Sequence, residues 1–493
     1  MRNFENDVQL LKYEVLREVA RLTLEGSLSK KYKTIPKKII PGPKARTRCC
    51  IYKEREIVNE RVKMAMGGNK ENNNIIEVIS VACDECPINR FTITEACRGC
   101  LAHKCSEACP VGAIYTVNQR AYIDTNKCIE CGRCKTVCPY NAVSDVMRPC
   151  KRACGSKAIY FDENKKAIID NNKCIQCGAC VYQCPFGAIV DKSFIVDVMK
   201  LLKRAKSREA FHVYAIIAPA ISSQFTYARI GQVVTGIKKL GFHDVVEVAL
   251  GADMVAKHES EEFINKLKEN KPMTSSCCPA FVSYIKKNYP ELAGHISNTV
   301  SPMIAISRLI KKIDKKSKIV FIGPCTSKKA EIYEPDIKGI TDYVITFEEL
   351  QAMLDASDIN IEECEDSPLN NASFYGRIFA RSGGLTEAVK NLLKSQDLDS
   401  NFKPVCCDGI LECDKALSRL KFNRLEGNFI EGMACIGGCI GGAASLAHGP
   451  KDKSQVDKYG SLALEKQVED SLRIFKLDEI DLNRGEGFNV SEV

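Results

Sequence analysis

The chain has 493 residues, a net charge of +9 and 27 cysteines. This length suits about two to four domains rather than one small module. No run of roughly 18 apolar residues occurs, so no membrane-spanning helix is expected. A disulfide scaffold is short, secreted and usually even in cysteine number, so we expect the cysteines to bind metal instead. The first residues lack the charged-then-apolar pattern of a secretory signal, and we expect a cytoplasmic protein.

Residues 1–80 are expected to form a basic helical extension. Apolar residues recur at helical spacing in residues 5–25, and residues 54–65 predict a second, shorter helix. A Pro- and Lys-rich linker lies between them, and positive charge gathers in residues 29–48. This basic segment is either a docking patch for an acidic redox protein or a solvated extension. No motif supports nucleic acid binding.

Short cysteine loops alternate with short strands in residues 81–195, which predicts two tandem ferredoxin-like units. Two runs match the bacterial ferredoxin spacing C-x2-C-x2-C-x3-C-P in full, a variant has one longer gap, and a half-motif follows. The full runs are Cys128, Cys131, Cys134, Cys138 and Cys174, Cys177, Cys180, Cys184, the variant is Cys97, Cys100, Cys105, Cys109, and the half-motif is Cys150, Cys154. Cys83 and Cys86 would supply the pair that the half-motif lacks.

These sixteen cysteines suit about four 4Fe–4S clusters, because each cluster takes four thiolates. In two-cluster ferredoxins the fourth cysteine of each run binds the neighbouring cluster, so we expect interleaved sets. The sets are Cys97, Cys100, Cys105 with Cys138; Cys128, Cys131, Cys134 with Cys109; Cys174, Cys177, Cys180 with Cys154; and Cys83, Cys86, Cys150 with Cys184. In an alternative reading, Cys83 and Cys86 are ordinary thiols near a domain boundary.

Residues 205–450 change in texture and predict an α/β domain with largely parallel sheets. Apolar runs at 213–217, 245–250 and 319–322 predict buried strands. Amphipathic stretches at 260–270, 281–288, 302–312 and 385–393 predict helices between them. Residues 451–493 are expected to form a helical tail, with a helix over 453–475. The fold class is therefore a multidomain combination of α+β and α/β regions.

Three cysteine segments in this domain are the strongest signals of chemistry. Cys325 follows a predicted strand and a Gly-Pro turn, at the strand end where α/β proteins build their sites. Cys278 precedes Pro279, a favoured first helical residue. Cys435 and Cys439 are four residues apart, so one helical turn would put both thiolates on one face. The glycines around them are expected to let a bulky inorganic cluster approach the backbone.

Together these segments resemble the active-site signature of the [FeFe]-hydrogenases, over roughly residues 81–450. The resemblance implies a two-lobed iron hydrogenase catalytic domain over residues 205–450. It also implies an H-cluster, which is a 4Fe–4S cubane bridged to a di-iron subsite with CO, CN⁻ and azadithiolate ligands. The implied cubane ligands are Cys278, Cys325, Cys435 and Cys439, with Cys439 bridging to the di-iron subsite.

The resemblance further implies residues that handle protons and position the di-iron subsite. A relay made of Cys277, Glu262, Ser297 and Glu259 would pass protons between the azadithiolate amine and bulk water. Lys328 would pair with an iron-bound cyanide, because a buried anion needs such a partner. Met433 matches the family methionine near the di-iron carbonyls.

The chain departs from the family pattern in places and resembles the divergent subgroup often labelled group B. Gly323 stands where the family usually has methionine, and Phe281 where it has tryptophan. The six remaining cysteines, expected to be buried thiols, are Cys49, Cys50, Cys364, Cys406, Cys407 and Cys413. No G-x-G-x-x-G fingerprint opens a βαβ unit, so we expect no NAD or flavin site.

The implied function is that of a ferredoxin hydrogenase, which interconverts H2 with two protons and two electrons. Electrons would travel through the 4Fe–4S clusters to ferredoxin or a similar small redox carrier, and maturation proteins would install the di-iron subsite. The alternatives are a non-catalytic iron–sulfur assembly or electron-transfer protein, a hydrogen sensor, and a subunit of an electron-bifurcating complex. Cys277, Glu262 and Lys328 favour the enzyme over the assembly protein.

Overall fold

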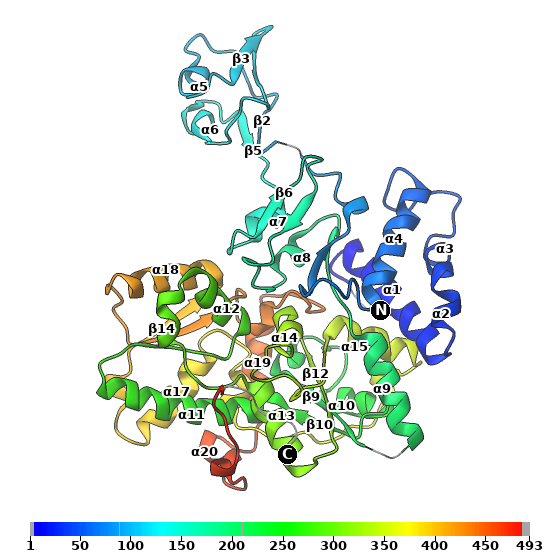
Figure 1. Cartoon of the computed structure of the whole chain (residues 1–493), viewed down its shortest axis with the longest axis vertical. Coiled ribbons are helices and arrows are strands. Elements are labelled where there is room, and N and C mark those ends of the chain that lie inside the picture. Colours follow the sequence, from blue (N-terminus) through cyan, green and yellow to red (C-terminus); the bar gives the residue numbers. More distant parts are fainter. Residues whose placement is uncertain (1–3, 88, 209–210, 486–493) are drawn as a thin grey trace.

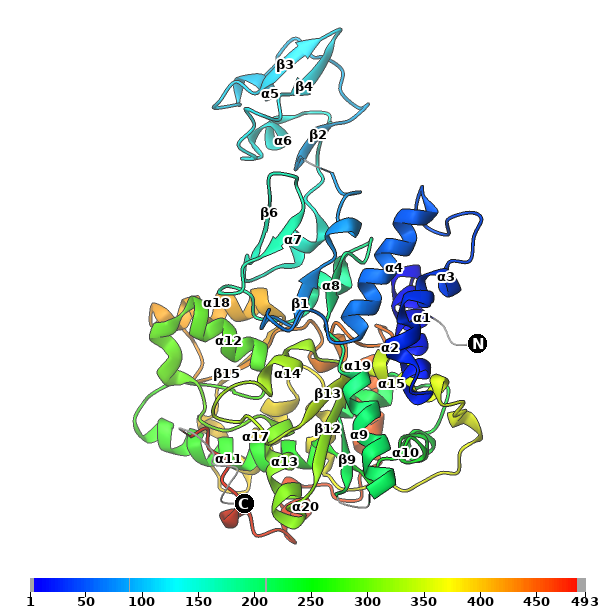
Figure 2. The ribbon, with the colours of Figure 1, turned by 45° about the vertical axis from the view of Figure 1, so that its right-hand side comes forward.

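The computed structural model describes residues 4–87, 89–208 and 211–485 of the chain. Its shape is elongated, with two small iron–sulfur-type units stacked on a large α/β region (Figure 1). A group of N-terminal helices lies beside the lower of the two small units (Figure 2). No helix in the described residues is long and apolar enough to cross a bilayer.

The N-terminal extension is helical, as its periodicity predicts. Its helices are α1 (Asp7–Leu24), α2 (Leu28–Lys31), α3 (Ile35–Ile39) and α4 (Ile51–Ala65). The Asn6 side chain accepts a hydrogen bond from the Gln9 amide and so caps α1. The stretch predicted as a linker contains the short helices α2 and α3. Pro36 is compatible with α3 because it occupies the first turn, where the N–H that proline lacks would have no helical partner.

The two small units each contain a pair of antiparallel two-stranded sheets. The outer unit comprises residues 91–145, and the inner unit comprises residues 76–86 and 149–191. The outer sheets pair β2 (Phe91–Ile93) with β5 (Val143–Asp145) and β3 (Ile114–Val117) with β4 (Arg120–Ile123). The inner sheets pair β1 (Ile76–Val78) with β8 (Ile189–Asp191) and β6 (Ile159–Phe161) with β7 (Ala167–Ile169). The chain therefore inserts the outer unit into the inner unit, which refines the expected tandem order.

Each small unit also carries two short helices that follow one another down the molecule (Figures 1 and 2). They are α5 (Lys104–Glu107) and α6 (Arg133–Val137) in the outer unit, then α7 (Pro149–Ala153) and α8 (Ala179–Gln183) in the inner unit. The α5 helix lies farthest from the large region, and α8 lies closest to it.

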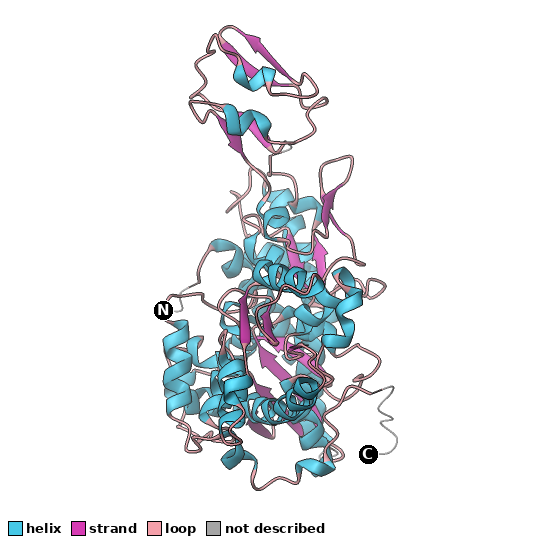
Figure 3. Ribbon diagram, turned by 90° about the vertical axis from the view of Figure 1, so that its left-hand side faces the viewer, coloured by secondary structure: helices cyan, strands magenta, loops and turns pink. Residues whose placement is uncertain are grey.

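The large region is built on two parallel sheets, which give it two lobes. One sheet has the order β10 (Asp244–Glu247), β9 (Val213–Ile217), β12 (Lys318–Gly323) and β13 (Tyr343–Thr346). The other has the order β11 (Met273–Thr274), β15 (Phe429–Met433) and β14 (Pro404–Asp408). Parallel strands need crossover connections, and helices supply them on both faces (Figure 3).

The helices of the large region are α9 (Ile195–Arg208), α10 (Ile230–Lys239), α11 (Val248–Lys268), α12 (Pro279–Asn288), α13 (Pro302–Ile313), α14 (Thr326–Glu331), α15 (Phe347–Ala356), α16 (Phe374–Ile378), α17 (Gly384–Lys394) and α18 (Ile410–Lys421). The four predicted amphipathic stretches fall in α11, α12, α13 and α17, and the region contains further helices that were not predicted. The strand predicted over 245–250 ends at Glu247, where α11 begins and continues through the helix predicted over 260–270.

The C-terminal part contains two helices rather than the single helix predicted over 453–475. They are α19 (Asp452–Ser461) and α20 (Val468–Leu472), which pack on α16 and α11 respectively. The chain extends between them because the Glu465 carbonyl accepts a hydrogen bond from the Phe374 amide of the core. Residues 486–493 of the expected tail lie outside the described residues.

Candidate iron–sulfur and active site

The fourth cysteine of each iron–sulfur run sits in the same backbone loop. The residue three positions later has a left-handed backbone in every case: Gly112 (φ 61°), Asn141 (φ 49°), Lys157 (φ 54°) and Gly187 (φ 56°). The next residue is always alanine, and its N–H donates to the cysteine sulfur. These bonds join Ala113 to Cys109 (3.2 Å), Ala142 to Cys138 (3.3 Å), Ala158 to Cys154 (3.2 Å) and Ala188 to Cys184 (3.2 Å). The region is therefore a fourfold repeat whose backbone N–H groups favour anionic sulfur.

In the outer unit, two small cavities collect the eight cysteines in two sets. One is lined by Cys97, Cys100, Cys105 and Cys138. The other is lined by Cys109, Cys128, Cys131 and Cys134. The fourth cysteine of each run thus lies with the other run's cysteines, as in the interleaved assignment.

In the inner unit, electrostatic neighbours define the other two sets. Burial raises the pKa of Cys150 to about 11, and the Cys184, Cys86 and Cys83 sulfurs add to that rise. Burial likewise raises the pKa of Cys177 to about 12, with Cys174 and Cys154 among its neighbours. Cys83 and Cys86 therefore lie beside Cys150 and Cys184, as the assignment expected.

Every set consists of four thiols, which are the soft anionic donors that iron–sulfur clusters take. Among the described residues, no three ligating side chains converge closely enough to hold a single metal ion. A cubane does not need that convergence, because each thiolate binds a different iron atom at a corner. The residues of the four sets therefore fit 4Fe–4S clusters.

The inner unit docks directly on the large region through the loop that carries Cys174 and Cys177. The Thr326 hydroxyl donates to the Gln176 carbonyl at 2.7 Å, and the Ser327 hydroxyl donates to the Ile175 carbonyl at 3.1 Å. Gly178 has no room for a side chain, because an added Cβ would lie 2.7 Å from Ala443 and from Thr326. The cysteine loop is thus fixed against two of the cysteine segments of the large region.

Cys278 and Cys325 occupy the helix starts that the sequence predicts. Cys278 is the N-cap of α12, with Pro279 in the first turn. Cys325 is the N-cap of α14 and directly follows β12 and its Gly-Pro turn. Both sulfurs therefore lie near helix N-termini, where an anionic group is stabilised.

The segment with Cys435 and Cys439 is a turn and not the expected helical turn. Gly437 and Gly438 have φ angles of 84° and 86°, which end any helix there. Gly438 and Gly442 are packed closely against other parts of the protein and do not border open space. A Cβ on Gly438 would lie 2.6 Å from the Ser382 amide nitrogen, and one on Gly442 would lie 2.5 Å from the Pro324 carbonyl oxygen. The Ala444 amide donates to the same Pro324 carbonyl at 3.1 Å, which holds this segment against the residue before Cys325.

The four segment cysteines are electrostatic neighbours of one another. Burial raises the pKa of Cys325 to about 11, and the Cys278 sulfur contributes further. Burial raises the pKa of Cys435 well above its ordinary value, and Cys325, Cys177, Cys278 and Cys439 all contribute. Cys177 of the inner unit therefore adjoins this group. Buried thiols of this kind lose their protons when a metal binds them, so the set fits a further iron–sulfur cluster.

Cys277 lies at the inner end of a group of polar side chains that reaches toward the surface. Burial raises the pKa of Cys277 strongly, and Glu259 is the first of the charged neighbours that raise it further. Glu259 is fully buried and accepts hydrogen bonds from the Ser276 amide (3.0 Å) and hydroxyl (2.9 Å). The Ser297 hydroxyl donates to Glu262 at 2.7 Å, and Glu262 is partly exposed.

Glu259 is therefore the inner carboxylate and Glu262 the outer one. The reason is helical: Glu259 lies one turn nearer the buried first half of α11. Burial raises the pKa of Glu259 to about 7. A group with this pKa can both accept and donate a proton near neutral pH.

Lys328, Glu331 and Met433 border the cysteine group. The Lys328 Nζ pairs with a Glu331 carboxylate oxygen at 2.7 Å, and both side chains are buried. Lys328 also lies among the charged neighbours of Cys325 and Cys439. Met433 ends β15 and is 3% exposed. Gly323 is a steric necessity here, because an added Cβ would lie 2.5 Å from the Phe321 ring.

The expectation that the other six cysteines are buried holds for only some of them. Cys364, Cys407 and Cys413 are buried, whereas Cys49 and Cys406 are exposed and Cys50 is intermediate. Cys406 alternates with Cys407 on β14, so the two side chains point to opposite faces of the sheet.

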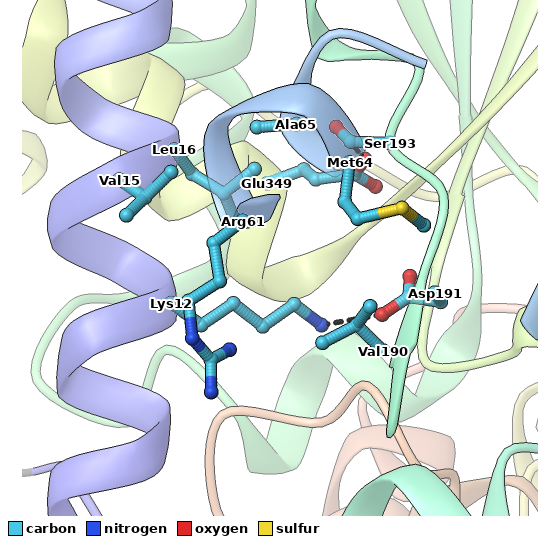
Figure 4. Close-up of a pocket in the computed structure, with 10 residues that line it drawn as sticks. All are labelled: Lys12, Val15, Leu16, Arg61, Met64, Ala65, Val190, Asp191, Ser193 and Glu349. Atoms are coloured by element: carbon cyan, nitrogen blue, oxygen red, sulfur yellow. Dashed lines mark hydrogen bonds and ion pairs between the residues drawn. The ribbon is translucent and has the colours of Figure 1, made fainter. Parts of the chain in front are cut away.

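A buried ionic network next to this region was not foreseen from the sequence. Lys12 of α1 pairs with Asp191 (2.6 Å) and Glu348 (2.5 Å), and Figure 4 shows the contact with Asp191. Lys329 of α14 pairs with Asp191 (2.9 Å) and Glu349 (3.0 Å). The network joins the N-terminal extension, the inner unit and the large region. Lys329 could have been noticed in the sequence because it follows Lys328 of the second cysteine segment. The sequence around Lys12 gives no such hint.

Comparisons with known proteins match three parts of the chain. Residues 211–443 match the family model described as "Iron only hydrogenase large subunit, C-terminal domain". Residues 96–142 and 120–185 match two models described as "4Fe-4S dicluster domain". Ferredoxin-like modules followed by an α/β domain are thus confirmed as the fold class.

Individual relatives match different shares of the chain. The periplasmic [Fe] hydrogenase large subunit of Nitratidesulfovibrio vulgaris is 31% identical, over 65% of this chain and 85% of its own length. Iron hydrogenase 1 of Clostridium pasteurianum is 29% identical, over 82% of this chain and 78% of its own. The cytosolic Fe-S cluster assembly factor narfl of Xenopus tropicalis is 25% identical, over 47% and 61%.

Among solved structures, a variant of the [FeFe]-hydrogenase HydA1 from Chlamydomonas reinhardtii shares the fold of part of the chain. The two are 18% identical, with a TM-score of 0.50 over 60% of this chain and all of that one.

Proposed function

This chain belongs to the iron-only hydrogenase family, and we propose that it interconverts dihydrogen with two protons and two electrons. In this proposal Cys278, Cys325, Cys435 and Cys439 hold the cubane of an H-cluster. When bound, the H-cluster supplies the iron site at which dihydrogen is split or formed. Sixteen further cysteines hold four accessory 4Fe–4S clusters.

One observation carries the proposal: a polar relay starts beside the cubane cysteines and ends at a partly exposed carboxylate. In this proposal the relay runs through Cys277, Glu259, Ser297 and Glu262: Glu259 is a charged neighbour of Cys277, and the Ser297 hydroxyl donates to Glu262. Burial raises the pKa of Glu259 to about 7, so this carboxyl can take up and release a proton near neutral pH. A reaction that releases or consumes protons in a buried site requires such a path.

Each residue of the relay has a definite task. The Cys277 thiol gives and takes the proton at the inner end. Glu259 holds that proton in the interior, where the Ser276 N–H and hydroxyl steady its carboxylate. Ser297 connects to Glu262, which exchanges the proton with water. Lys328, held by Glu331, places a positive charge beside Cys325 and Cys439, where it would bind an anionic ligand of the di-iron subsite.

The accessory clusters would form a single row between the H-cluster and the outer tip. Cys105, Cys134, Cys150 and Cys180 mark the four sets, because they lie in or at α5, α6, α7 and α8. Those helices follow one another down the molecule (Figures 1 and 2). We propose that ferredoxin or a similar small redox carrier exchanges electrons at the outer end of the row, and that hydrogenase maturation proteins install the di-iron subsite.

A second candidate function is iron–sulfur cluster assembly, which the similarity to the narfl assembly factor favours. Such a protein would use the clusters without the relay. The two functions differ in what happens when the relay is cut.

Turnover of the matured protein tests the proposal. Protein co-expressed with maturation proteins is expected to evolve H2 from reduced methyl viologen. Cys277→Ala is expected to lower this rate about 100-fold or more, because it removes the innermost proton carrier. Cys364→Ala is the matched control, since Cys364 is also a buried thiol but bonds only the Asn360 carbonyl far from the relay. Full iron loading without any H2 turnover would overturn the hydrogenase proposal and favour assembly.

A further inference from the structure

The N-terminal extension covers one particular cysteine set of the inner unit. Arg48 and α4 lie against the segments that carry Cys83, Cys86 and Cys184. The Arg48 Nη2 donates to the Ala82 carbonyl at 3.3 Å, and its guanidinium lies 5.2 Å from the centre of the Phe186 ring. This set of Cys83, Cys86, Cys150 and Cys184 is the one we call the covered set.

Arg61 of α4 reaches deepest toward the covered set. Its side chain extends from α4 toward α1 (Figure 4) and is 5% exposed. Its Nη2 donates to the Gly187 carbonyl at 2.7 Å, and Gly187 closes the loop around the Cys184 sulfur. An added Cβ on Gly187 would lie 2.2 Å from this Nη2, so the guanidinium rests directly on the loop.

Arg61 carries a buried positive charge that no carboxylate neutralises within the described residues. Its Nε has no hydrogen-bond partner among the described residues, and its Nη2 donates to the neutral Gly187 carbonyl. Burial lowers the pKa of Arg61 to about 10, and the Cys184 sulfur is the neighbour that opposes this. The guanidinium is therefore charged at neutral pH. Arg48 differs, because it pairs with Glu85 at 3.3 Å.

Arg148, from the inner unit, also lies beside the covered set and is also buried without a carboxylate partner among the described residues. It is 6% exposed and donates to the carbonyls of Pro87 (3.1 Å) and Lys165 (2.5 Å). No ion pair joins it to a described carboxylate, and it is a charged neighbour of Cys86. Two buried cations thus flank four thiols, and a buried charge without a counter-charge is unfavourable.

We propose that Arg61 and Arg148 are compensated by an anionic 4Fe–4S cluster in the covered set, and that they raise its reduction potential above those of the other accessory clusters. The inference rests on the cluster assignment of the proposed function. A cluster held by four thiolates becomes more negative by one charge when it takes up one electron. A nearby cation stabilises the reduced form more than the oxidised form, so reduction becomes easier.

Among the described residues, the outer unit has no buried arginine without a carboxylate partner beside its cysteine sets. Its Arg120 pairs with Glu95 at 2.8 Å, and Arg90, just before the unit, pairs with its Asp145 at 3.0 Å; both arginines are about one-third exposed. The covered set lies third in the row counted from the outer tip. An easily reduced cluster there would hold one electron from dihydrogen while the other leaves through a one-electron carrier. The N-terminal extension would thereby shape electron flow without touching the active site.

A redox titration of the reconstituted full-length protein, followed by EPR, tests the proposal. Wild-type protein is expected to show one 4Fe–4S signal that appears at a higher potential than the others. Arg61→Gln is expected to shift this signal to more negative potential and to leave the remaining signals unchanged. Arg61→Lys keeps the charge and is expected to shift it less.

Arg55→Gln is the matched control on the same helix. Arg55 also donates only to carbonyls, those of Ile40 and Pro41, but it lies away from the covered set, so no signal is expected to move. If Arg61→Gln does not load its clusters, Arg148→Gln is expected to give the same negative shift. Unchanged potentials in the loaded variants would overturn the proposal. A missing fourth cluster, seen as low iron content in the wild type, would instead overturn the cluster assignment, and neither result depends on hydrogenase activity.

Discussion

The outer and inner units share one fold and one pattern of N–H to sulfur bonds, yet their surroundings differ. Gly112 and Gly187 occupy the same loop position with φ angles of 61° and 56°. No atom lies within 4 Å of a Cβ built on Gly112, whereas Arg61 and Val8 crowd the equivalent position at Gly187. The cysteine spacing therefore sets which cluster is bound, and the neighbouring helices set its environment. One unit is open to a partner, and the other is enclosed by the rest of the chain.

The largest expected difference concerns electron delivery. Cys177→Ala in the inner unit is expected to reduce H2 turnover with a protein carrier to background, because Cys177 adjoins the cubane cysteines. Cys100→Ala in the outer unit is expected to impair turnover with the carrier but to spare turnover with a small dye that reaches the inner clusters. H2 turnover of both variants is measured with the protein carrier and with the dye. Equal losses of dye-driven turnover in the two variants would contradict the expected difference between the units.

Anchoring of the inner unit should be the next largest effect. Lys329→Met removes a buried cation from Asp191 and Glu349, and we expect a loss of about 3–5 kcal/mol in the free energy of unfolding. Although burial opposes ionisation, Lys12 and Lys329 hold the pKa of Asp191 well below its usual value. This contribution therefore holds above the usual pKa of an aspartate and is lost only in strong acid.

Denaturant unfolding of the loaded protein measures this loss. Lys135→Met on the exposed face of α6 is the control, with an expected change within about 0.5 kcal/mol. A similar result for the two variants would show that the network does not hold the inner unit in place.

The paired glycines give a smaller and better matched test. Gly112→Ala and Gly187→Ala both place a side chain at a positive φ, so that strain is common to the two variants. Gly187→Ala must also displace Arg61 and Val8, which adds about 1–3 kcal/mol of overpacking. Unfolding midpoints of the two variants give the difference directly. Equal destabilisation would mean that the N-terminal extension is not packed on this loop in solution.

The smallest effect is expected at the surface of the outer unit. Glu95→Gln breaks the ion pair with Arg120, but Glu95 has 91% of its side chain exposed. Water and salt screen such a pair, so we expect a loss of less than about 1 kcal/mol, shrinking further at high ionic strength. Thermal unfolding at low and high salt measures it, and a loss as large as that of Lys329→Met would contradict the contrast between open and enclosed units.

The sequence predicts those parts of the molecule that local spacing controls. The ferredoxin runs, the strands before Cys325 and around residues 213–217, and Pro279 after Cys278 all lie where the patterns place them. Local spacing failed at Cys435 and Cys439, because two glycines with positive φ replace the helical turn. Nor does spacing show which of Glu259 and Glu262 lies deeper, because the two are one helical turn apart on α11.

Long-range features could not be read from the sequence at all. Arg61 meets Gly187 across 126 residues, and Lys12 meets Glu348 across 336. Neither partner carries a local signal, since a lysine on an amphipathic helix usually faces water. The insertion of the outer unit into the inner one cannot be predicted either, because it depends on the pairing of β1 with β8, which are far apart in the sequence.

The most direct test of the central claim is an infrared spectrum of the anaerobically matured protein. The account predicts bands in the region where iron-bound CO and CN⁻ stretch, and predicts that they shift when H2 is added. A protein with all of its 4Fe–4S clusters loaded, but with no such bands after maturation, would contradict the hydrogenase assignment and point to electron transfer or cluster assembly.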